Sequence, residues 1–144
     1  MDHAVQLVRD WVDASRRIVA LTGAGLSTES GIPDFRGPQG LWTKDPESEK
    51  LSNIHYYMAD REIRRRAWKS RLDHPGWKAT PSAGHLALVE LERRGTLLAV
   101  VTQNIDGLHQ RAGHARDIVI EVHGTMLEVM CMSCRWRGPA GPVH

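Results

Sequence analysis

Apolar residues recur at helical spacing near the N-terminus of the chain. Val5, Val8 and Trp11 fall on one side of a helix over residues 2–15. Asp2 stands at the position where a side chain can cap that helix. The pattern therefore predicts an amphipathic first helix.

Two further stretches predict helices, and a region rich in Gly, Pro and short polar residues at 31–53 predicts mostly loop. The first helix covers about residues 58–72. In the second, Thr80 is expected as the cap and Pro81 as the first helical residue. Gly95 is expected to end it. Its apolar face is formed by Leu86, Leu88, Val89 and Leu91.

Three short apolar runs predict strands, at residues 18–21, 97–101 and 118–122. A continuous run such as residues 18–21 is typical of a strand that is buried on both faces of a parallel sheet. Alternation of strands with helices predicts an α/β fold. Ligands bind beyond the carboxyl ends of strands in such sheets. We therefore expect residues 22–25, 103–106 and 123–124 to converge on one site.

The chain has 144 residues, of which 41% are hydrophobic and 25% charged, which predicts one folded domain with a modest core. Its formal charge is only +2, so composition gives no reason to expect a nucleic-acid partner. The run Arg64–Arg66 is read as a solvated helix face. No apolar run reaches the roughly 20 residues that a membrane span needs.

Two cysteines, Cys131 and Cys134, stand too close together for an ordinary structural disulfide. Their spacing is that of zinc ligands, and a redox-active pair is the alternative. Residues 135–139 are a poor helix start, which disfavours the redox reading. Two ligands make half of a structural site, and His144 is a weak candidate for a third. A chain without a disulfide framework is expected in a reducing, cytoplasmic environment.

A glycine-rich turn, Gly23-Ala24-Gly25, follows the first predicted strand. Glycines at such a turn let the backbone approach a phosphate, and helix-terminal N–H groups can bind it. Thr28 stands where the ordinary dinucleotide fingerprint has its third glycine. Taken alone, the turn fits a structural role equally well.

Three blocks together resemble the sirtuins, the NAD-dependent protein deacylases. They are residues Gly23–Gly37, Thr102–His109 and His123-Gly124, in the family's order. The segment Gly37–Trp42 is most similar to the chromatin-associated branch and its bacterial relatives. The resemblance extends from Ile18 to Cys134 and implies a Rossmann-like sheet.

The resemblance also implies a division into an NAD-binding domain over residues 1–125 and the beginning of a zinc-binding module over residues 126–144. The family continues past this point, so we expect the chain to be a fragment or a truncated gene product. NAD+ is the implied co-substrate and Zn²⁺ the implied structural ion, bound by Cys131 and Cys134. The implied cofactor-binding residues are Gly23, Ala24, Gly25, Ser27, Thr28, Ile32, Asp34, Phe35, Arg36, Trp42, Gln103, Asn104, Ile105, Asp106 and His123.

Several of these residues have implied roles. Phe35 shields the nicotinamide end and Arg36 lies near the phosphates, where its planar fork suits two hydrogen bonds. Asn104 and Asp106 line the pocket that receives nicotinamide, and Gln103 contacts its ribose. An ordered surface loop and a turn would explain the same residues without chemistry.

His123 and Asn104 are the implied catalytic residues. A histidine has a pKa of about 6.5 when unperturbed, which suits a general base at neutral pH. In the family, the acyl oxygen attacks C1′ of the nicotinamide ribose, nicotinamide leaves, and the histidine activates a ribose hydroxyl. The products are free lysine, nicotinamide and O-acyl-ADP-ribose.

The implied function is NAD-dependent deacetylation of acylated lysine side chains of proteins. Mono-ADP-ribosyl transfer to protein is the nearest alternative, since it uses the same pocket with a different nucleophile. A truncated module that binds NAD or ADP-ribose without catalysis is the alternative from another class.

Overall fold

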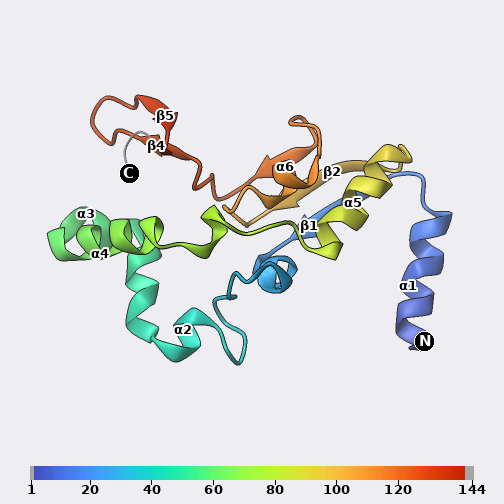
Figure 1. Ribbon diagram of the computed structural model, residues 1–144, viewed down its shortest axis with the longest axis horizontal. Helices are drawn as coiled ribbons and strands as arrows, with labels where there is room; N and C mark the ends of the chain where they lie inside the picture. The colour runs from blue at the N-terminus through green and yellow to red at the C-terminus, as the bar shows by residue number, and fades with distance from the viewer. Residues whose placement is uncertain (1, 142–144) are drawn as a thin grey trace.

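A three-stranded parallel sheet forms the centre of the molecule (Figure 1). The computed structural model describes residues 2–141. The sheet consists of β1 (Ile18–Thr22), β2 (Leu97–Thr102) and β3 (Val119–Glu121), in the order β1-β2-β3. The prediction of an α/β, Rossmann-like parallel sheet is confirmed.

Nine helical segments and a hairpin complete the described part of the chain. The hairpin pairs β4 (Glu128–Met130) with β5 (Arg137–Pro139) in antiparallel fashion. In Figure 1, α1 stands at one end of the molecule and α2, α3 and α4 at the other. The helical segments, with 3₁₀ helices labelled η, are α1 (His3–Ala14), η1 (Ala24–Ser30), α2 (Leu41–Lys44), η2 (Pro46–Ser52), α3 (Ile54–Ala59), α4 (Arg61–Leu72), η3 (Pro75–Trp77), α5 (Ala83–Arg93) and α6 (Leu108–Ala112).

The core lies on one face of the sheet. Val100 of β2 and Leu108 of α6 are fully buried there, and Val89 of α5 is almost fully buried. On the opposite face, Val19 and Leu21 of β1 are 60% and 71% exposed. The expectation that these strands are buried on both faces is therefore wrong for residues 2–141, because the packed helices cover only the other face.

The first helix begins as predicted. The Asp2 carboxylate accepts a hydrogen bond from the backbone N–H of Ala4 at 3.1 Å. Val5, Val8 and Trp11 share one side of α1, yet each is more than half exposed. Periodicity thus identified the helix, but this face has no packing partner within residues 2–141.

In the middle of the chain, one region predicted as mostly loop also contains short helices, and one predicted helix boundary is wrong. The expected loop at 31–53 contains the short helices α2 and η2. The expected single helix at 58–72 is divided at Asp60, whose carboxylate accepts a hydrogen bond from the N–H of Glu62 at 2.7 Å. Asp60 therefore caps α4 and separates it from α3, since an N-cap residue has non-helical backbone angles.

The predicted cap of α5 is also wrong. Ser82, rather than Thr80, is the N-cap, and it forms a capping box with His85. The Ser82 hydroxyl contacts His85 Nδ1 at 2.8 Å and donates to the Leu26 carbonyl at 3.0 Å. It therefore ties the start of α5 to η1, which Thr80-Pro81 could not do from two residues upstream.

Replacing Ser82 with Ala is expected to lower the free energy of unfolding by about 1–2 kcal/mol, because a helix cap and a buried hydrogen bond are both lost. Urea denaturation followed by circular dichroism measures the change. Thr80→Ala is the matched control, since the Thr80 side chain is exposed, and should be nearly neutral. Equal losses in both variants would contradict this assignment of the cap.

Candidate active site

The loops that follow β1 and β2 are joined by a buried polar network. The Asn104 amide donates to the Gly23 carbonyl at 3.0 Å and to the Ser27 hydroxyl at 3.1 Å. The Ser27 hydroxyl in turn donates to the Asp106 carboxylate at 2.7 Å. Ser27 and Asp106 are almost completely buried. Two of the three predicted strand ends therefore meet, as expected for a parallel sheet.

The second carboxylate oxygen of Asp106 is also held. It accepts the backbone N–H of Leu108 at 2.9 Å, at the start of α6. The guanidinium of Arg111 donates to the Asp106 carbonyl at 3.1 Å and to the Gly76 carbonyl at 2.7 Å. Sequence reasoning missed Arg111, which carries no motif signal of its own. The hydrogen bonds from Ser27 and Leu108 fix the orientation of the Asp106 carboxylate.

His123 lies at the third strand end, just beyond β3, and its side chain is exposed. Its Nδ1 is 3.2 Å from the carbonyl oxygen of Gln103. Because a carbonyl can only accept, this contact places the proton on Nδ1 and leaves the Nε2 lone pair available. The backbone N–H of Gln103 donates to the Thr22 carbonyl at 3.0 Å, which connects this end to β1. All three strand ends therefore converge.

The backbone of the glycine turn is open to close approach. A Cβ added at Gly23 or Gly25 would meet no atom within 4 Å. The backbone there can be approached closely, as phosphate binding requires. A cavity of about 430 Å³ is formed farther along the chain, from Thr28 onward. It is lined by Thr28, Gly31, Ile32, Pro33, Asp34, Pro38 and Gln39.

Phe35, Arg36 and Trp42 form a surface cluster beside this cavity. The rings of Phe35 and Trp42 have centroids 4.7 Å apart. The Arg36 guanidinium lies 4.4 Å from the centre of the Trp42 ring and 3.6 Å from the Glu49 carboxylate. Arg36 is therefore engaged with a ring and a carboxylate, and it would have to exchange them to contact a phosphate. Of the other predicted residues, Ala24 is half-buried at the first position of η1, and Ile105 is half-buried in the loop after β2.

A buried histidine cluster behind the site was missed. His109 contacts Thr22 Oγ1 at 3.0 Å through Nε2, and its ring lies 4.8 Å from His85 and 5.5 Å from His114. Burial, followed by repulsion from His85 and His114, lowers the pKa of His109 to about 4. Burial also lowers the pKa of His85. The only sequence signal for this cluster is that His109 belongs to the block Thr102–His109.

The two cysteines lie in the connection between β4 and β5. Hydrogen bonds from the Cys134 and Ser133 backbone lower the pKa of the Cys131 thiol, which favours a thiolate ligand. Cys134 is exposed, and both thiols are free. No cluster of three or more His, Cys, Asp or Glu ligands exists within residues 2–141. The residues thus fit half of a zinc site, and His144 lies outside the described residues.

None of the helices between residues 2 and 141 combines the length and the apolarity needed to cross a membrane.

A Rossmann-like sheet with a polar network at its carboxyl edge defines a class of nucleotide-binding α/β proteins. The sequence model of the Sir2 family matches residues 23–140, and the chain belongs to this family.

Curated relatives and a solved Sir2 structure are also similar to this chain. The chain is 53% identical over 126 residues to NAD-dependent protein deacetylase 2 of Streptomyces coelicolor, covering 88% of this chain and 52% of the relative. It is 42% identical to the NAD-dependent protein deacetylase of Bordetella pertussis, covering 96% and 49%. A Sir2 structure with a deacetylated p53 peptide and 3′-O-acetyl ADP ribose matches with a TM-score of 0.82 and 39% identity, over 95% of this chain and 54% of that one. The chain thus spans about half the length of the curated relatives it matches.

Proposed function

We propose that this chain carries the catalytic edge of an NAD-dependent deacylase that acts on acetylated lysine side chains of proteins. The observation that carries the proposal is the joining of three strand ends in a Sir2-family chain: Ser27, Asn104 and Asp106 share one network, and His123 stands on the same edge. Relatives named NAD-dependent protein deacetylases support it.

When bound, NAD+ supplies a ribose whose bond to nicotinamide can be broken and a hydroxyl that can take up the acyl group. The Gly23–Gly25 turn and the cavity lined by Thr28, Ile32 and Asp34 provide its binding surface. The Asn104 amide oxygen and the Asp106 carboxylate supply acceptors for the N–H groups of a carboxamide, and backbone groups supply the donors it needs. Their orientation is set before binding, because both already belong to the Ser27 network.

His123 is proposed as the general base. Its Nε2 accepts a proton from the ribose hydroxyl, since Nδ1 is directed at the Gln103 carbonyl. The exposure of His123 lets a substrate reach it, whereas the more deeply buried histidines cannot be reached in this way. The imidazolium that forms keeps the Nδ1–H bond to Gln103, which stabilises the added charge.

The zinc-binding module is proposed from Cys131 onward. Cys131 and Cys134 would provide two of the four ligands that a structural zinc ion takes, with the others from residues outside 2–141. We also propose the division at residue 125, because the hairpin of β4 and β5 follows directly after the sheet. A cytoplasmic location is proposed on the free thiols.

The test is product analysis of the 144-residue chain with NAD+ and an acetyl-lysine peptide. The expected result is peptide-dependent release of nicotinamide with O-acetyl-ADP-ribose, read by mass spectrometry. If radiolabel from NAD+ instead remains attached to protein, the activity is mono-ADP-ribosyl transfer. Saturable binding of ADP-ribose to folded chain without nicotinamide release would assign a non-catalytic binding module, and would overturn the enzymatic proposal for this chain.

A further inference from the structure

Arg111 of α6 connects two segments that lie far apart in the chain. Its Nη2 donates to the Gly76 carbonyl at 2.7 Å and to the Asp106 carbonyl at 3.1 Å. Its Nη1 donates to the Ala79 carbonyl at 2.8 Å. One guanidinium therefore binds three backbone carbonyls, which suits its planar set of N–H donors. These hydrogen bonds join the loop after β2 to the segment around η3.

The segment around η3 is itself held in place. His74 caps η3, and its Nδ1 accepts the N–H of Gly76 at 3.0 Å. The Trp77 indole donates to the Arg71 carbonyl at 2.7 Å, which fastens η3 to the end of α4. The Arg71 guanidinium in turn donates to the Met126 carbonyl at 2.7 Å. The η3 segment is therefore tied to α4 and to the chain beyond β3, and it can act as a fixed support.

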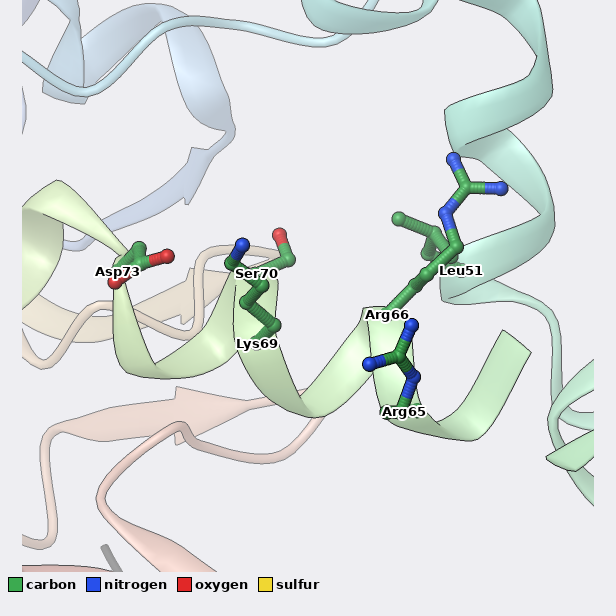
Figure 2. Close-up of a pocket in the computed structure, with 6 residues that line it drawn as sticks. All are labelled: Leu51, Arg65, Arg66, Lys69, Ser70 and Asp73. Carbon is green, nitrogen blue, oxygen red and sulfur yellow. The ribbon is translucent and has the colours of Figure 1, made fainter. Parts of the chain in front are cut away.

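The cavity along α4 is not part of this support. Figure 2 shows the helix, which is followed by Asp73 two residues before η3 begins. The cavity has a volume of about 440 Å³, and none of its lining residues is among those that Arg111 contacts. The lining residues are Leu51, Arg65, Arg66, Lys69, Ser70 and Asp73.

The backbone of the loop that carries Asp106 depends on Arg111. Two carbonyls of this loop are held by donors from outside it: the Asp106 carbonyl by Arg111, and the Ile105 carbonyl by the N–H of Met126 at 2.8 Å. Gly107, which directly follows Asp106, has a left-handed backbone with a φ of 70°. Without Arg111, the Asp106 peptide group loses its donor. A shift of that backbone displaces the carboxylate that it carries.

We propose that Arg111 is a positioning residue for Asp106 and sets the affinity for the nicotinamide end of NAD+. This inference rests on the proposed function, in which the Asp106 carboxylate accepts from the carboxamide of nicotinamide. Arg111 acts through the backbone, because it contacts the Asp106 carbonyl, whereas Ser27 and Leu108 donate to the carboxylate. ADP-ribose has no carboxamide, so its affinity does not depend on Arg111.

The test compares two ligands by isothermal titration into the 144-residue chain. In Arg111→Met, the Kd of NAD+ is expected to rise roughly tenfold, the equivalent of one weakened hydrogen bond to a charged group. The Kd of ADP-ribose should change by less than about twofold. Arg116→Met removes the same charge from an exposed position after α6 and should leave both affinities unchanged.

A second variant keeps the test independent of how well Arg111→Met folds. Arg111→Lys retains the charge and a donor on a shorter side chain, so it preserves part of the contact. It should raise the Kd of NAD+ by roughly threefold and leave that of ADP-ribose unchanged. Circular dichroism and urea denaturation check the folding of each variant.

The two ligands separate positioning from general support of the fold. Equal weakening of NAD+ and ADP-ribose in folded Arg111 variants would overturn the inference, as would unchanged affinity for both. Selective loss of NAD+ affinity in Arg111→Met, with no nicotinamide released from the original chain and acetyl-lysine peptide, would overturn the proposed function and leave the positioning role. An original chain that binds neither ligand would overturn both.

Discussion

Replacing His123 with Ala is expected to lower peptide-dependent nicotinamide and O-acetyl-ADP-ribose production by about 10²- to 10⁴-fold, the usual contribution of a general base. The reason is local. His123 is exposed just beyond β3, and within residues 2–141 its side chain has one hydrogen bond, with the Gln103 carbonyl at 3.2 Å. Removing it takes away the Nε2 lone pair and leaves the Ser27–Asp106 network in place.

A matched variant separates this chemical loss from unfolding. His55→Ala removes another exposed histidine that stands in α3, outside the site, and should keep full activity. Both variants should unfold at the same urea concentration as the original chain, because neither side chain is buried. Activity of His123→Ala within about threefold of the original would remove this residue from the catalytic role.

The second large effect is on stability in acid. His109 is 1% exposed, and its pKa is lowered to about 4 from about 6.5 in an unfolded chain. Well above pH 6.5 His109 is neutral in both the folded and the unfolded state and contributes no pH dependence. As the pH falls towards 4, only the unfolded state takes up the proton, so the free energy of unfolding decreases. The expected loss from His109 is about 3 kcal/mol across this range.

Urea unfolding at a series of pH values measures this slope, and His109→Gln isolates the contribution. Gln keeps a polar group that can reach Thr22 Oγ1 but cannot be protonated, so the slope between pH 6.5 and 4 should become shallower. His85, whose pKa burial also lowers, keeps part of the slope in the variant. His55→Gln, at an exposed position, should leave the curve unchanged. Identical slopes in all three proteins would contradict the assignment to His109.

The loops of the site show how far sequence patterns reach. Apolar runs located all three strands, although one face of the sheet is exposed in residues 2–141. The edge at which ligands bind followed from the parallel order of the strands. Caps were less predictable. Ser82 and Thr80-Pro81 are both good helix starts, and the choice between them depended on the Leu26 carbonyl, which lies 56 residues away in sequence.

The sequence by itself determined the family, the α/β class and the three segments that carry the chemistry, because these depend on local residue order and on apolar periodicity. Only the tertiary structure decided which polar atoms meet: Asn104 with Ser27, His123 with the Gln103 carbonyl, and Arg71 with the carbonyls after β3. It also decided that one face of the sheet is exposed in residues 2–141 and that His85, His109 and His114 pack together. Such contacts join residues far apart in the chain, and no local pattern records which distant partner a side chain will find.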